Sequence, residues 1–101
     1  MKKKFHVLIV DDHPLIVEAY KSALSVVASK LKNYSFFINT AFDCETAFEK
    51  INNAVNSETL DLIFLDINLP PSKKLNILSG EDLGIKINEL LPNSKIIIST
   101  T

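Results

Sequence analysis

The sequence has very little cysteine and glycine, and both shortages exclude kinds of site. Cys44 is the only cysteine among 101 residues, which rules out an internal disulfide and a multi-cysteine zinc site. Two glycines are too few for a GxGxxG dinucleotide loop. A lone thiol is compatible with a reducing cytosol, so we expect a cytoplasmic protein with a structural cysteine.

The chain also lacks an excess of either charge and any long apolar run. Its 11 basic and 12 acidic residues give a net charge of -1, which is too little to hold nucleic acid or an anionic membrane by charge alone. No apolar run approaches the roughly 20 residues that span a bilayer. Lysines precede the run from Phe5 to Val10, as in a signal peptide, but two aspartates follow it in place of a cleavage site. We therefore expect a soluble chain that recognises its partners locally.

The composition and the apolar pattern predict one α/β domain over residues 1–101, or part of one. Short runs rich in β-branched and aromatic residues predict strands at Phe5 to Val10, Phe36 to Ile38, Leu62 to Leu65 and Ile96 to Ile98. Apolar residues at helical spacing predict helices at Ile16 to Leu31, Ala47 to Val55 and Leu83 to Leu91. This alternation predicts a parallel sheet with right-handed crossovers and helices on its faces.

Boundary residues support the three helices. Pro14 suits the first turn of one helix, Asp43 can cap the next, and Ser79 with Asp82 resembles a capping box for the third. The segment 70–78 is long for a connection between a strand and a helix. We expect a solvated surface insertion there, and a contact surface beside the site is the alternative.

Acidic side chains follow two of the predicted strands. Asp11 and Asp12 come after the first strand, and Asp66 comes after the third. Ligands of open parallel sheets bind outside the carboxyl ends of the strands, so neighbouring strands would bring these carboxylates together. Carboxylates that close repel unless a cation intervenes, which predicts a hard divalent metal such as Mg²⁺. Each aspartate alone is also typical of a turn or a helix cap.

Three segments resemble motifs of bacterial response-regulator receiver domains. They are VLIVDDHP at 7–14, LIFLDINLP at 62–70 and IIIST at 96–100. The resemblance covers nearly the whole chain, and the DDHPL run is similar to regulators whose receiver precedes a helix-turn-helix DNA-binding domain. It implies a flavodoxin-like, doubly wound parallel sheet with strand order 2-1-3-4-5.

The resemblance also implies roles for individual residues. Asp66 would be the phosphoacceptor and would contact Mg²⁺, with Asp12 as a metal ligand and Asp11 acting on the metal directly or through water. The backbone carbonyl of Asn68 would complete the metal shell. Thr100 would be the switch residue that hydrogen-bonds the acquired phosphate, although the register can slip by one residue to either neighbour.

The sequence departs from the family pattern in two places. The family places a glycine soon after the motif proline, whereas 71–78 intervenes here before Gly80. The chain also stops at Thr101, so the family's last helix, strand and helix, and the lysine after its fifth strand, have no counterpart. We expect a receiver fragment with an incomplete βαβαβαβ fold. Lys73 and Lys74 are expected to be solvated, with an approach to the phosphate as the alternative.

An incomplete sheet would leave the fourth strand as an exposed edge. Unpaired backbone groups and uncovered apolar side chains favour association, so we expect homo-oligomers through this edge or poor stability.

Two histidines are discounted as metal ligands. His6 lies inside a predicted strand. His13 is close enough to influence the site, but one imidazole beside two carboxylates lacks the spacing of a zinc site.

The leading functional hypothesis is a phosphorylation switch that is not an enzyme beyond its own phosphorylation and dephosphorylation. A histidine kinase would supply the phosphoryl group to Asp66, and the output, in a domain or protein outside the chain, would be transcription. One alternative is a phosphorylation-independent interaction module that keeps the fold. Another is a metal-dependent phosphoesterase. The sequence has neither the DxDx(T/V) pattern after the first strand nor the catalytic histidine pair that such an enzyme would need.

Overall fold

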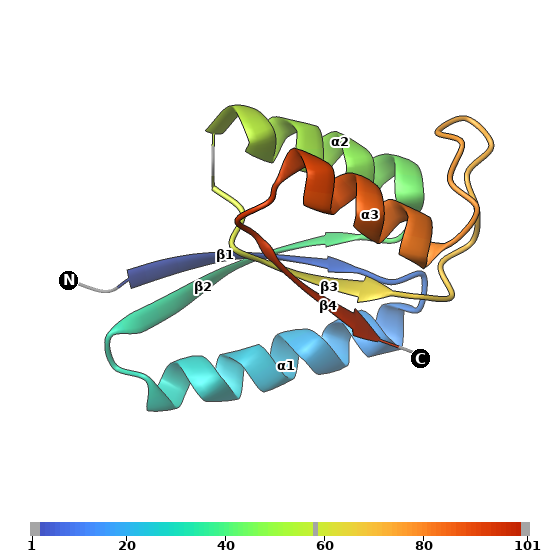
Figure 1. Cartoon of the computed structure of the whole chain (residues 1–101). Coiled ribbons are helices and arrows are strands. Elements are labelled where there is room, and N and C mark those ends of the chain that lie inside the picture. Colours follow the sequence, from blue (N-terminus) through green and yellow to red (C-terminus); the bar gives the residue numbers. More distant parts are fainter. Residues whose placement is uncertain (1–2, 58, 100–101) are drawn as a thin grey trace.

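Residues 3–57 and 59–99 are described by a computed structural model (Figure 1). In chain order the elements are β1 (Lys3–Val10), α1 (Pro14–Lys30), β2 (Tyr34–Ala41), α2 (Cys44–Ser57), β3 (Leu62–Asp66), α3 (Gly80–Leu90) and β4 (Lys95–Ser99). Every strand and helix predicted from the apolar pattern is present. β2 is longer than predicted, and exposed residues alternate with half-buried ones from Phe36 to Thr40.

The four strands form one parallel sheet in the order β2-β1-β3-β4. This is the order that the resemblance implies for the first four strands. In the register, Val10 of β1 pairs with both Ala41 of β2 and Leu65 of β3, and Asp66 pairs with Ser99 of β4. Because all strands are parallel, their carboxyl ends lie at one edge of the sheet, and the loops that follow them are neighbours.

Helices cover both faces of the sheet: α1 lies on one face, and α2 and α3 lie side by side on the other (Figure 1). The central strand β1 is buried on both faces, since Val7 and Ile9 pack with Val17 of α1 while Leu8 and Val10 pack in the larger core under α2 and α3. Continuous apolar strands predicted this burial.

The helix starts lie at the same edge of the sheet as the strand ends. Pro14 is the first residue of α1. Asp43 Oδ1 accepts a hydrogen bond from the Thr46 backbone N–H at 2.7 Å, which caps α2 and lowers the pKa of Asp43. Ser79 Oγ accepts from the backbone N–H of Asp82 at 3.3 Å, which caps α3 as predicted.

The segment 70–78 is mostly exposed, as expected of a surface insertion, but Ser72 and Ile77 within it are buried. Ser72 and Ile77 form an antiparallel bridge with N–O distances of 2.8 and 2.9 Å, and Ile77 is only 1% exposed. The Ser72 hydroxyl donates to Glu45 of α2 at 3.3 Å. Asn76 turns the tip with a φ of 55°, a conformation that asparagine tolerates. A nonlocal core contact therefore anchors this loop.

Apolar side chains are exposed along β4. In the described part of the chain, β4 pairs with β3 alone, and Ile98 is 51% exposed.

Across the described ranges, no helix is both long enough and apolar enough to cross a membrane.

Candidate functional site

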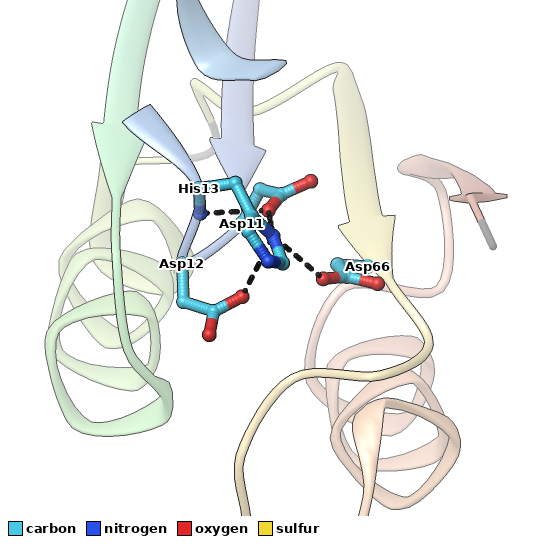
Figure 2. Close-up of side chains that lie close together, drawn as sticks. All are labelled: Asp11, Asp12, His13 and Asp66. Atoms are coloured by element: carbon cyan, nitrogen blue, oxygen red, sulfur yellow. Dashed lines mark hydrogen bonds and ion pairs between the residues drawn. The ribbon is translucent and has the colours of Figure 1, made fainter. Parts of the chain in front are cut away.

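Three carboxylates and one imidazole meet at the carboxyl edge of the sheet (Figure 2). Asp11 and Asp12 directly follow β1, and Asp66 is the last residue of the adjacent strand β3. Together with His13, each residue offers one ligand atom such that all four atoms lie within 4.8 Å of one another. The structure thus brings together the three aspartates that the sequence predicted.

Asp66 is the most deeply buried of the carboxylates, with 1% of the residue exposed. Its Oδ1 accepts a hydrogen bond from the backbone N–H of Asn68 at 2.9 Å. Its Oδ2 is buried and accepts no hydrogen bond from any described residue. Burial raises the pKa of Asp66, and the negative charges of Asp11 and Asp12 add to the rise. A cation bound at Oδ2 would stabilise the ionised form of this carboxylate.

The acidic pair differs in access to solvent. Asp11 is buried, and its backbone N–H donates to the carbonyl of Ala41 at 3.1 Å, which ties the β1 end to β2. Asp12 is partly exposed, yet its Oδ1 is buried and accepts no hydrogen bond within the described ranges. Asp12 therefore directs one oxygen into the protein, while part of its side chain remains in contact with solvent.

The ring of His13 lies among the carboxylates (Figure 2). Its Nδ1 is 2.8 Å from Oδ1 of Asp11, 3.1 Å from Oδ1 of Asp12 and 3.9 Å from Oδ2 of Asp66. The hydrogen bond with Asp11 raises the pKa of His13, and the charge of Asp12 raises it further. Sequence reasoning placed His13 near the site but not inside it.

The local backbone explains the position of this ring. His13 is the residue that precedes α1, with extended φ and ψ of -106° and 104°, and its side chain makes no cap hydrogen bond. Its backbone N–H donates to Asp11 Oδ1 at 2.9 Å. A residue before proline is restricted to extended backbone, so the sequence indicates this backbone conformation but not the direction of the ring.

The donor set fits a divalent metal ion. Asp12 and Asp66 each present a buried oxygen that lacks a hydrogen bond from the described residues, and Asp11 contributes a third carboxylate. Magnesium and similar hard cations bind through a few carboxylates and retain several waters. The partial exposure of Asp12 leaves an open side for such waters.

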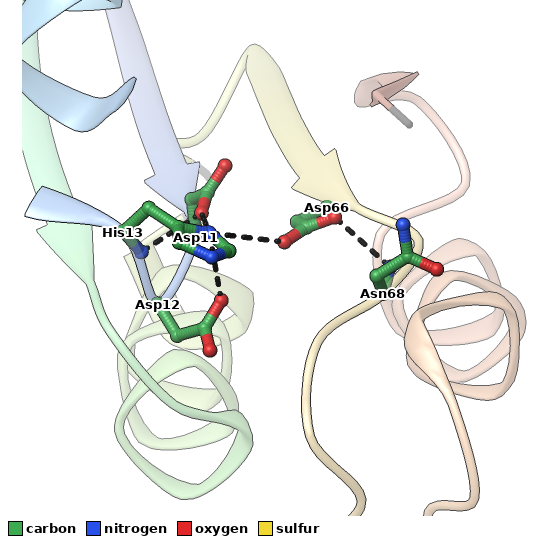
Figure 3. Close-up of polar contacts among 5 residues, drawn as sticks. All are labelled: Asp11, Asp12, His13, Asp66 and Asn68. Carbon is green, nitrogen blue, oxygen red and sulfur yellow. Dashed lines mark hydrogen bonds and ion pairs between the residues drawn. The ribbon is translucent and has the colours of Figure 1, made fainter. Parts of the chain in front are cut away.

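The other predicted site residues are placed as follows. Asn68 lies on the far side of Asp66 from His13, and it is the Asn68 N–H that contacts the carboxylate (Figure 3). The role of the Asn68 carbonyl stays a prediction. Thr100 lies outside the described residues, so its role as a switch also stays a prediction. Ser99, its neighbour, pairs with Asp66, which puts the end of β4 beside the acidic site.

Of the residues that we discounted, His13 lies among the carboxylates, and the others are outside this cluster. Lys73 and Lys74 are exposed on the 70–78 loop, and Lys74 lines a surface hollow with residues of α2. The ring of His6 stacks on Phe37, with centroids 5.2 Å apart. Cys44 is buried, and burial raises the pKa of its thiol, so it is a packing residue.

Comparisons with known proteins support the fold. No protein-family model matches the chain, and no curated protein matches its sequence at a significant level. Among solved structures, the chain is similar to the crystal structure of a response regulator receiver domain protein from Clostridium thermocellum, with a TM-score of 0.71 and 22% identity. The match covers 93% of this chain and 63% of that chain. The protein therefore has the flavodoxin-like parallel α/β fold of a receiver domain.

Proposed function

We propose that the chain is the phosphoacceptor part of a two-component response regulator and that Asp66 takes the phosphoryl group. The observation that carries this proposal is the buried Asp66 carboxylate with an open oxygen facing the acidic pair Asp11 and Asp12. The likeness of the fold to a receiver domain supports it.

Each residue of the site would have a separate role in phosphoryl transfer. The Asn68 N–H holds Asp66 Oδ1, which fixes the carboxylate for in-line attack. An Asp66 oxygen would form the bond to phosphorus while the bond to the donor histidine nitrogen of the kinase breaks, and the released imidazole would keep a proton. Asp11, Asp12, Asp66 and the Asn68 carbonyl would hold Mg²⁺, which neutralises charge on the phosphoryl oxygens when bound.

The consequences of phosphorylation would pass through β4. The end of this strand, at Ser99, pairs with Asp66, and the resemblance assigns the bond to the phosphate to the next residue in the sequence, Thr100. We propose that the chain is cytoplasmic and that its partner is a histidine kinase. The switch would control an output domain or protein, and the output would be transcription. The exposed apolar edge of β4 would also pair two copies of the chain. A monodisperse monomer in light scattering at high concentration would count against this pairing.

The transfer is tested by intact mass after incubation with Mg²⁺ and acetyl phosphate. We expect one phosphoryl adduct on the wild-type chain and none on Asp66→Asn. Glu18→Gln, which removes an exposed carboxylate on α1, is the control and should be labelled like the wild type. Undiminished labelling of Asp66→Asn would contradict the assignment of Asp66 as the phosphoacceptor.

A second candidate is an interaction module that keeps the fold without accepting phosphate. It is favoured by one observation: within 3–57 and 59–99, no lysine makes an ion pair with Asp66, and His13 is the basic group beside it. A chain that binds Mg²⁺ but acquires no phosphoryl group from acetyl phosphate or from a phosphorylated kinase would support this candidate.

A further inference from the structure

The proposed metal site contains a nitrogen donor beside its oxygens. We propose that His13 is a ligand of the bound metal through Nδ1, and that the site therefore prefers a first-row transition ion such as Mn²⁺ or Ni²⁺ to Mg²⁺. The inference rests on the metal site of the proposed function and adds to it a ligand and the class of ion.

The distances between donor atoms match those around one ion. Two ligands that each lie about 2.1 Å from a metal and at right angles are about 3 Å apart. His13 Nδ1 is 2.8 Å from Asp11 Oδ1 and 3.1 Å from Asp12 Oδ1, as adjacent ligands would be. It is 3.9 Å from Asp66 Oδ2, close to the spacing of about 4.2 Å for opposite ligands. The imidazole thus needs little movement to share an ion with the carboxylates.

A second observation points to a ligand between these groups. The side chain of Asp66 is fully buried, and its Oδ2 faces the His13 ring without accepting a hydrogen bond from a described residue. A buried carboxylate oxygen left open is costly, and an ion bound between the two side chains would remove this cost.

The histidine is also free to accept a metal without disturbing the fold. Its side chain is 55% exposed and does not cap α1, while its position is fixed by the backbone bond to Asp11 and by Pro14. An ion can therefore reach Nδ1 from solvent, and removal of the ring leaves the helix start intact.

The nitrogen ligand decides the choice of ion. Imidazole suits transition metals, whereas Mg²⁺ prefers oxygen ligands alone. With three carboxylates and one imidazole, the order of affinity should rise from Mg²⁺ through Mn²⁺ to Ni²⁺. From the sequence, we discounted His13 because one imidazole beside two carboxylates lacks the spacing of a zinc site. That spacing rule does not describe a site with three carboxylates and one imidazole.

The test titrates the whole chain with Mg²⁺, Mn²⁺ or Ni²⁺ by calorimetry, using wild type, His13→Ala and His6→Ala. His6 is the matched control because its ring stacks on Phe37 away from the site. We expect His13→Ala to lose about tenfold or more in Mn²⁺ and Ni²⁺ affinity and to change Mg²⁺ affinity by less than about threefold. His6→Ala should bind all three ions like the wild type.

Pulsed electron paramagnetic resonance of the Mn²⁺-loaded wild-type chain gives an independent readout that needs no variant. We expect hyperfine coupling to an imidazole nitrogen, lost in His13→Ala and kept in His6→Ala. Metal binding without this coupling, or an equal loss of Mg²⁺ and Mn²⁺ affinity in His13→Ala, would overturn the role of His13 and leave the aspartate site standing. A wild-type chain that binds none of the three ions would overturn both.

Discussion

Gly80 packs so closely against Asp66 that a Cβ on this glycine would lie 2.2 Å from the Asp66 backbone carbonyl oxygen. The Gly80 N–H also donates to the carbonyl of Ile67 at 3.2 Å. The long segment between β3 and α3 is therefore closed at its base, and the start of α3 lies directly against the backbone that carries Asp66. Gly80 is the first residue of α3, so this close approach sets where the helix begins relative to β3.

Gly80→Ala should lower the free energy of unfolding by about 2 kcal/mol or more, because the new methyl group meets backbone atoms that cannot move aside. Gly84→Ala is the matched control in the same helix. Its Cβ would meet only the Leu65 side chain, at 3.3 Å, and alanine favours the helix by up to about 1 kcal/mol. Urea denaturation compares the two variants. Equal stability of both would show that the contact at Gly80 is not tight.

Asp66→Asn should stabilise the metal-free chain at neutral pH by an amount on the order of 1 kcal/mol, because it removes a buried charge. Burial raises the pKa of Asp66 in the folded state above its unfolded value of 3.8. The folded state therefore binds the proton more tightly than the unfolded state. As pH rises from 3.8 through the folded-state pKa of Asp66, the free energy of unfolding of the wild type falls. The difference between the variants should vanish as pH falls towards 3.8.

Thermal denaturation in a chelator at several pH values measures this difference, and added Mg²⁺ or Mn²⁺ should reverse it by raising the melting temperature of the wild type more than that of the variant. A variant that is less stable than the wild type at pH 7 in chelator would contradict the cost assigned to the buried carboxylate.

In the metal-free chain, His13 should titrate above its usual pKa of 6.5, because the hydrogen bond with Asp11 favours the protonated ring. This interaction stabilises the fold below pH 6.5 and is lost as pH rises through the folded-state pKa of His13. Imidazole resonances followed by NMR in chelator report the titration, and Asp11→Asn should bring the pKa back towards 6.5. No change on this substitution would exclude the contact with Asp11 as the cause.

Ile77→Ala should cost about 2 to 4 kcal/mol of unfolding free energy, because this side chain is 1% exposed in the core beneath α2 and α3. Leu78→Ala is the control one residue along, with a side chain 78% exposed and an expected change within about 0.5 kcal/mol. Denaturant titration of both variants tests whether the 70–78 loop belongs to the core. Small and equal effects would mean that it does not.

Most of the fold could be predicted because its signals are local. Apolar runs and helical spacing located every element, and Pro14, Asp43 and Ser79 marked the helix starts. The burial of Ser72 and Ile77 could not be predicted in the same way. Single buried residues in a polar stretch show no periodicity, and their partners on α2 are distant in the sequence.

The candidate site was predictable where it depends on topology and not where it depends on side-chain direction. Parallel neighbouring strands were enough to bring Asp66 to Asp11 and Asp12. The His13 ring lies in the site because of the backbone angles just before α1 and the hydrogen bond to Asp11. Spacing rules for zinc ligands describe neither of these.

The role of Asp66 as phosphoacceptor is tested by hydroxylamine treatment of the chain after incubation with acetyl phosphate and a divalent metal. Hydroxylamine cleaves an acyl phosphate but leaves a serine or threonine phosphate intact. We predict one phosphoryl group on the wild-type chain, removed by hydroxylamine and absent from Asp66→Asn. A phosphoryl group that survives hydroxylamine, or that appears equally on Asp66→Asn, would contradict the assignment of Asp66.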